Sequence, residues 1–264
     1  MVDLLAVAPD PVVAAPAASA LYEQDQSRQA GGAALHPGGL ALTACLLQQC
    51  DLPPGARLLD AGCGPGASLD WLRAQGTFDA VGVDLSAALL RQAANLQLDV
   101  ARAPLGNLPF PATSFEAILL ECSLSASMQP GIAAGGSGWA AARAALGEAQ
   151  RVLRPGGWLL LSDLYARRPE GIAALRELPA AGCLRSLLDL AGLRQELEEL
   201  GFTVCFWEDH SETLPRPGSQ ISQAYGSPQS FWEQFAGQAV DAFDLALCTG
   251  RARPGYFILA AQKN

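Results

Sequence analysis

One stretch of the chain, residues 58–66, constrains the fold more than any other, because it reads as an apolar strand that ends in a glycine turn. Its sequence is LLDAGCGPG, with Gly62, Gly64 and Gly66 at every second position. Glycine lets the backbone approach a ligand at a place where a side chain would block it. A helix-like segment follows at residues 67–75, and Asp60 stands at the strand end, beside the expected ligand.

A second apolar run, residues 80–83, ends in another acid, Asp84, which follows Gly66 by 18 residues. An acidic residue at the end of the second strand, at about this spacing, is typical of a group that binds the two hydroxyls of a ribose. The sequence therefore predicts a cofactor that contains a nucleoside.

The glycine spacing separates two kinds of nucleoside cofactor. Dinucleotide-binding oxidoreductases use Gly-x-Gly-x-x-Gly in the same strand-turn-helix setting, but here the third glycine, Gly66, comes one residue early. Asp60 also lies two residues before the first glycine, where it would repel an anionic pyrophosphate and attract a cationic group. These two details favour a cofactor with a cationic amino acid portion over a nicotinamide dinucleotide.

Four ordered segments resemble the class I methyltransferases that use S-adenosylmethionine. Residues 58–66 are similar to their glycine motif, and residues 81–86 (VGVDLS) to their second motif. Residues 107–115 (NLPFPATSF) resemble the segment after their third strand, and residues 149–163 (AQRVLRPGGWLLLSD) their Arg-Pro-Gly-Gly turn and fifth strand. The resemblance covers residues 54–163 and points to the small-molecule branch called type 11.

Strands and helices alternate along the chain, which predicts an α/β fold with a doubly wound parallel sheet and helices on both faces. The resemblance implies a Rossmann-like sheet of the class I methyltransferase type, with the last strand antiparallel and inserted between strands five and six. Outside the motifs we expect strands at 117–120, 202–207 and 256–261, and helices at 39–50, 184–200 and 231–247.

The expected organisation is one methyltransferase domain, residues 21–264, after a flexible tail at residues 1–20. Within the domain we expect an N-terminal helical lid (21–53), a cofactor-binding core (54–163) and a substrate-side part (164–264). The tail lacks the basic start and uninterrupted apolar centre of a secretory signal, and no apolar run is long enough for a transmembrane helix. Seven cysteines, an odd number, favour reduced thiols and a cytoplasmic protein.

Charge limits the partners. Twenty-six acidic and seventeen basic residues give a formal net charge of −9, which would repel nucleic acid and anionic membranes. We therefore expect a small-molecule substrate, with no nucleic-acid or membrane partner; the sequence gives no basis for an oligomeric state.

The resemblance also implies which residues contact S-adenosylmethionine. The family usually carries an adenine-binding acid where this chain has Pro104, so adenine recognition is expected to rest on the backbone of Leu105 and on apolar contacts. The expected cofactor-binding residues are Asp60, Gly62, Cys63, Gly64, Gly66, Asp84, Leu85, Leu105 and Glu121. In-line methyl transfer depends mainly on positioning, and with two histidines and no Cys-x-x-Cys we expect no metal site.

Cysteines offer one alternative for the acceptor. The region after the fifth strand resembles arsenite methyltransferases, which carry a cysteine where Cys183 stands and another near the position of Cys248; Cys122 or Cys45 could add a third thiolate for As(III). Each of these cysteines could equally be a small core residue. His210 is a candidate general base or a solvated loop residue. The main hypothesis is an unspecified small organic acceptor, and a non-catalytic S-adenosylmethionine-binding protein is a further alternative.

Overall fold

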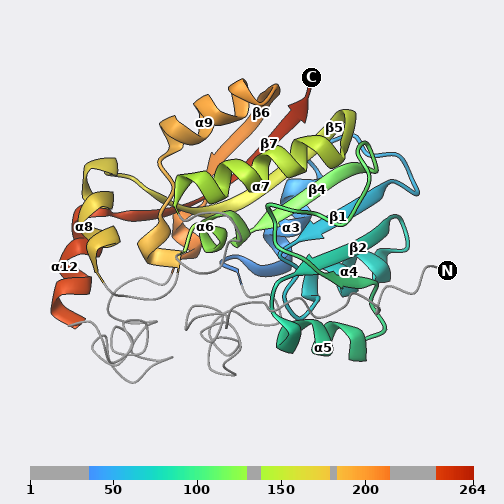
Figure 1. Cartoon of the computed structure of the whole chain (residues 1–264), viewed down its shortest axis with the longest axis horizontal. Coiled ribbons are helices and arrows are strands. Elements are labelled where there is room, and N and C mark those ends of the chain that lie inside the picture. The colour runs from blue at the N-terminus through green and yellow to red at the C-terminus, as the bar shows by residue number, and fades with distance from the viewer. Residues whose placement is uncertain (1–35, 130–137, 179–182, 215–241) are drawn as a thin grey trace.

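A seven-stranded mixed sheet forms the centre of the computed structural model, which describes residues 36–129, 138–178, 183–214 and 242–264 (Figure 1). The strands are β1 (Arg57–Ala61), β2 (Asp79–Asp84), β3 (Val100–Arg102), β4 (Phe115–Glu121), β5 (Leu153–Ala166), β6 (Phe202–Asp209) and β7 (Pro254–Lys263). Their order across the sheet is β3-β2-β1-β4-β5-β7-β6. The first five strands pair in parallel, and β7 is antiparallel to both β5 and β6. This confirms the predicted α/β fold, including the inserted antiparallel last strand.

Helices cover both faces of this sheet. They are α3 (Gly39–Leu47), α4 (Ala67–Gln75), α5 (Ala87–Asn95), α6 (Ser123–Ser127), α7 (Trp139–Val152), α8 (Ile172–Glu177), α9 (Leu190–Glu199) and α12 (Ala242–Ala252), with short 3₁₀ turns η1 (Pro169–Gly171), η2 (Cys183–Ser186) and η3 (Ser211–Thr213). None of the helices in the described ranges combines the length and apolar character needed to cross a membrane.

Successive residues of each strand supply two separate hydrophobic cores, because side chains alternate between the faces of a sheet. Leu59 of β1 belongs to the core that α7 and α9 cover, whereas its neighbour Leu58 belongs to the core that α3, α4 and α12 cover. Both leucines are fully buried. Burial on both faces explains why these strands read as continuous apolar runs rather than alternating ones.

Two predicted helices have different limits in the structure. The leucine spacing predicted a helix over 184–200, but α9 begins at Leu190, because Leu188 pairs with β5 through hydrogen bonds to Leu164 and Ala166. The carboxylate of Asp189 then caps the helix by accepting a hydrogen bond from the Ala191 amide at 3.1 Å. The helix expected at 39–50 ends at Leu47.

The expected tail and parts of the expected lid and 231–247 helix fall outside the residues that the structure describes. The expected tail at 1–20, the part of the expected lid at 21–35 and the segment 231–241 lie outside the described residues. The end of the predicted 231–247 helix is seen as part of α12, which continues to Ala252.

Candidate functional site

Three acidic side chains come together where β1, β2 and β4 end. Asp60 is in register with Gly82 of β2 and Leu119 of β4, so Asp84 and Glu121 each stand two residues beyond it on the flanking strands. We call Asp60, Asp84 and Glu121 the carboxylate edge. In a sheet of this kind, ligands bind beyond the carboxyl ends of the strands.

The turn after β1 requires its glycines. Gly62, Gly64 and Gly66 have φ values of 97°, 53° and 90°, a region that L side chains rarely adopt. A Cβ on Gly62 would lie 2.3 Å from Cβ of Ser123, and one on Gly66 would lie 2.4 Å from Cδ1 of Leu98. The turn therefore brings bare backbone to the sheet edge and leads directly into α4.

Asp84 holds this turn in place. Its Oδ2 accepts a hydrogen bond from the Gly64 amide at 2.9 Å, and its Oδ1 accepts one from the Ser86 amide at 2.7 Å. Ser86 in turn caps α5 by accepting a hydrogen bond from the Leu89 amide. Asp84 therefore links the glycine turn after β1 to the start of α5.

Asp60 is buried beside the other two acidic groups of the edge. It is 3% exposed, and burial, followed by repulsion from Glu121 and Asp84, raises the pKa of its carboxyl well above the usual value. No hydrogen bond from the described part of the chain offsets these influences. A cation placed beside Asp60 would relieve the repulsion and stabilise the ionised form.

Glu121 connects the edge to two helices. Its carboxylate accepts hydrogen bonds from the hydroxyls of Thr43 on α3 at 2.9 Å and Ser68 on α4 at 2.8 Å. Nε2 of His36 lies 3.5 Å from the same carboxylate, and both side chains are buried. The sequence analysis assigned Glu121 to the site but missed these three partners, which are 53 to 85 residues away along the chain and carry no local motif.

A second polar group that the sequence analysis missed lies behind β4. The thiol of Cys122 donates to the hydroxyl of Tyr256 at 3.5 Å, and that hydroxyl donates to Ser162 at 2.9 Å. Burial, with a further contribution from Cys122, raises the pKa of Tyr256 well above its usual value. Cys122 is therefore already engaged by the C-terminal strand.

Asp163 of β5 fixes α6 beside this group. It is fully buried and accepts hydrogen bonds from the Ser125 amide at 2.8 Å, the Ser125 hydroxyl at 2.5 Å and the Leu164 amide at 2.7 Å. Burial raises the pKa of Asp163 to about 6, and the hydrogen bonds from Ser125 limit that rise.

Three apolar residues were also expected at the site, namely Cys63, Leu85 and Leu105. Cys63 is buried and packs with Leu69 and Leu90, and burial raises the pKa of its thiol. The carbonyl of Leu85 accepts a hydrogen bond from Nε of Arg102 at 2.9 Å, and Leu105 packs against the core on the α7 side. The buried position of Cys63 between apolar side chains fits a packing role for this residue.

The cysteines considered for metalloid binding occupy separate elements. Cys122 follows β4, Cys183 lies in η2, where its side chain is not described, and the half-buried Cys248 lies in α12. The structure instead brings Cys45 of α3 next to His210 and Glu208, three residues that the sequence analysis did not place together.

Comparisons with known proteins agree with this architecture. A family model described as a methyltransferase domain matches residues 59–161. An uncharacterized methyltransferase of Bacillus subtilis, YodH, is 32% identical over 145 residues, which are 53% of this chain and 56% of that protein. A demethylmenaquinone methyltransferase of Corynebacterium urealyticum is 29% identical over 197 residues, covering 64% of this chain and 80% of that protein. The chain thus aligns with little more than half the length of the Bacillus relative.

Solved structures share the fold. The [4+2]-cyclase SpnF superposes with a TM-score of 0.65 at 24% identity, covering 93% of this chain and 92% of the cyclase. A phosphoethanolamine N-methyltransferase of Haemonchus contortus, in complex with S-adenosylmethionine, gives a TM-score of 0.63 at 16% identity over 93% of this chain and 57% of that protein. At these identities the likeness establishes the fold alone.

Proposed function

We propose that this chain is a class I S-adenosylmethionine-dependent methyltransferase, as its similarity to methyltransferases indicates, and that it transfers a methyl group from that cofactor to a small-molecule acceptor by direct in-line displacement. The observation that carries the proposal is the carboxylate edge beside the glycine turn, with Asp60 buried and without a cationic partner among the described residues. Its negative charge suits a cationic amino acid portion and opposes a pyrophosphate, which argues against the oxidoreductase alternative.

Each residue of the edge has a distinct proposed role. The Asp84 carboxylate accepts hydrogen bonds from the ribose hydroxyls while it holds Gly64, and Asp60 attracts the cationic portion of the cofactor. Glu121 positions α3 and α4 around the turn. The remaining proposed contacts are backbone at Gly62, Gly64 and Gly66, small packing at Cys63, and adenine contacts at Leu85 and Leu105.

When bound, S-adenosylmethionine supplies an electrophilic methyl carbon on a sulfonium. The chain's own task is then to hold the acceptor in line and to exclude water. We propose that residues 21–53 act as the lid over the core at 54–163, since His36 and Thr43 both reach the Glu121 carboxylate. Residues 164–264 would form the substrate side.

The acceptor is proposed to be a small organic molecule. The relatives named above are methyltransferases, one of them named for demethylmenaquinone, and the net charge of −9 disfavours nucleic acid and anionic membranes. The six cysteines whose side chains are described are free thiols, which fits a cytoplasmic location. Cys122, Cys183, Cys248 and His210 remain candidates for contact with the acceptor, and a metalloid acceptor would require at least two of these cysteines to converge.

An assay of methyl transfer tests the proposed function. Purified protein is incubated with S-adenosylmethionine and a panel of O, N, C, S and As(III) acceptors, and formation of S-adenosylhomocysteine is measured. Acceptor-dependent product confirms the proposal and names the acceptor class. Cofactor binding without product from any acceptor class would favour the non-catalytic binding protein.

A further inference from the structure

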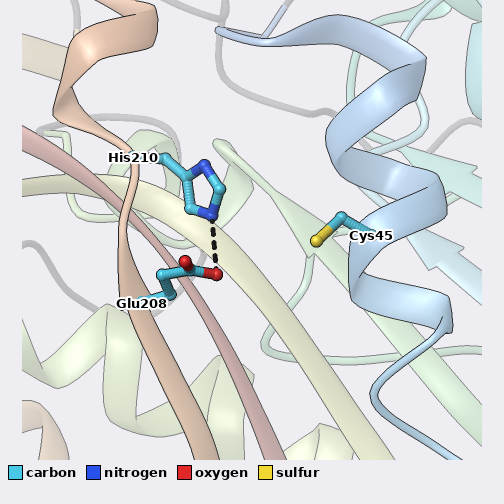
Figure 2. A group of neighbouring side chains, drawn as sticks. All are labelled: Cys45, Glu208 and His210. Carbon is cyan, nitrogen blue, oxygen red and sulfur yellow. Dashed lines mark hydrogen bonds and ion pairs between the residues drawn. The ribbon is translucent and has the colours of Figure 1, made fainter.

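Cys45, Glu208 and His210 form a cluster of three side chains of metal-ligating type, which shares no residue with the carboxylate edge (Figure 2). Figure 2 shows the sulfur of Cys45, on α3, directed toward the His210 imidazole and the Glu208 carboxylate, which come from the end of β6 and the residue after it. One ligand atom from each residue lies within 4.8 Å of the other two. We propose that this cluster binds a divalent transition-metal ion of the zinc type.

The donor set fits zinc. A thiolate, an imidazole and a carboxylate are the three ligand types that Zn²⁺ uses, at about 2.0–2.3 Å. Tetrahedral geometry at those bond lengths puts ligand atoms about 3.3–3.8 Å apart. Glu208 and His210 already lie 3.1 Å apart, and the ligand atoms of all three residues lie within 4.8 Å of one another, so the Cys45 sulfur has to approach by at most about 1 Å. The described residues supply three ligands, which leaves a fourth position for water or another donor.

Both ring nitrogens of His210 lie near carboxylates. Nε2 of His210 lies 3.1 Å from Glu208 inside the cluster, while Nδ1 faces the Glu212 carboxylate at 3.5 Å. A carboxylate on the far nitrogen fixes the tautomer of a metal-binding histidine and raises its basicity. The His210 amide also donates to the Tyr256 carbonyl at 2.8 Å, which fixes the backbone beneath the ring.

The Glu208 carboxylate can adjust its position to a bound ion. Glu208 has a side chain that is 53% exposed, whereas the His210 side chain is 16% exposed. The carboxylate can therefore change rotamer toward the metal while the imidazole stays in place.

A bound ion would join parts of the chain that are far apart in sequence. Cys45 lies on α3, the helix that also carries Thr43 against Glu121, and His210 follows β6 at the opposite edge of the sheet from β3. The metal would hold the lid helix to the substrate-side strands and stabilise the folded protein by linkage. This inference does not depend on the identity of the methyl acceptor.

The test uses Co²⁺ as a spectroscopic probe on the full chain, after removal of bound metal with a chelator. Wild type is expected to develop a thiolate-to-cobalt charge-transfer band at one equivalent, which Zn²⁺ then displaces, and Zn²⁺ is expected to raise the melting temperature. Cys45→Ser should lose the band, and His210→Gln should weaken binding at least tenfold. The matched control is Cys205→Ser, since Cys205 is an exposed thiol on the same strand as Glu208, and it should keep the band.

Absence of the band in wild type, or its persistence in Cys45→Ser, would overturn the proposal. Loss of the band in Cys205→Ser would do so as well. If Cys45→Ser fails to fold, His210→Gln and Glu208→Gln carry the same test, and unchanged cobalt affinity in both would overturn it.

Discussion

The amide of Gly64 donates a hydrogen bond to the Asp84 carboxylate at 2.9 Å, and this bond joins the glycine turn after β1 to the end of β2. Two features that the sequence presents separately, 20 residues apart, are therefore one structural unit. The acid that is expected to bind ribose also sets the position of the backbone that is expected to face the cofactor.

Asp84→Asn is expected to weaken S-adenosylmethionine binding at least tenfold. Asparagine has one acceptor oxygen instead of two, and its NH₂ group would face the Gly64 or Ser86 amide; a hydrogen bond to a charged group contributes about 1.5–3 kcal/mol. Calorimetric titration measures the effect. Asp79→Asn is the matched control, because Asp79 is exposed at the other end of the same strand; equal losses in both variants would contradict the assignment.

Asp60→Asn is expected to weaken cofactor binding without lowering the stability of the protein. The substitution removes a buried carboxyl whose ionisation is opposed by burial and by its acidic neighbours, so the free energy of unfolding at pH 7 should be unchanged or higher. Affinity for the cationic cofactor should fall at least tenfold. Chemical denaturation and calorimetry check the two parts, and unchanged affinity would contradict the proposed contact between Asp60 and the cofactor.

Gly62→Ala is expected to destabilise the protein by about 2 kcal/mol or more, because the new methyl would meet Ser123 and φ is positive. Gly147→Ala provides the contrast: Gly147 lies within α7 with nothing within 4 Å of the added methyl, so a gain of up to about 1 kcal/mol is expected. Thermal unfolding distinguishes the two. Equal stability of both variants would refute the close approach at the turn.

The raised pKa of Asp163 should make the free energy of unfolding depend on pH. The pKa of its carboxyl is about 6 in the folded protein, against 3.8 for a solvent-exposed aspartate. The native state therefore binds more protons than the unfolded state between these values, and the contribution of this group to stability falls as pH rises through that window. Asp163→Asn does not titrate. The free energy of unfolding of wild type relative to this variant should therefore fall by about 3 kcal/mol from pH 3.5 to pH 6.5, as measured by denaturant titrations; a constant difference would contradict the raised pKa.

Much of the fold could be predicted because its signals are local. Glycines 62, 64 and 66 need positive φ, and Ala67 starts α4 where the sequence predicted a helix. Leu58 and Leu59 are apolar in succession because opposite faces of β1 are both buried. The helix predicted over 184–200 is present as α9 but begins later, at Leu190. Leu187 is buried before the helix begins and continues the leucine spacing of α9, so the pattern predicted too early a start.

The contacts between distant segments could not be predicted in this way. Thr43 reaches Glu121 across 78 residues, and Tyr256 reaches Ser162 across 94. Neither pair belongs to a motif, because each depends on which helix or strand the folded sheet places opposite another. The Cys45, Glu208 and His210 cluster was missed for the same reason, and the sequence expectation of no metal site rested on local spacing alone.

The most direct test of the account is a calorimetric titration of the wild-type protein with S-adenosylmethionine. Saturable one-to-one binding is expected for wild type, and Asp60→Asn should weaken it at least tenfold, because the carboxylate is proposed to attract the cationic portion of the cofactor. Absence of binding by wild type would contradict the proposal that the carboxylate edge holds this cofactor.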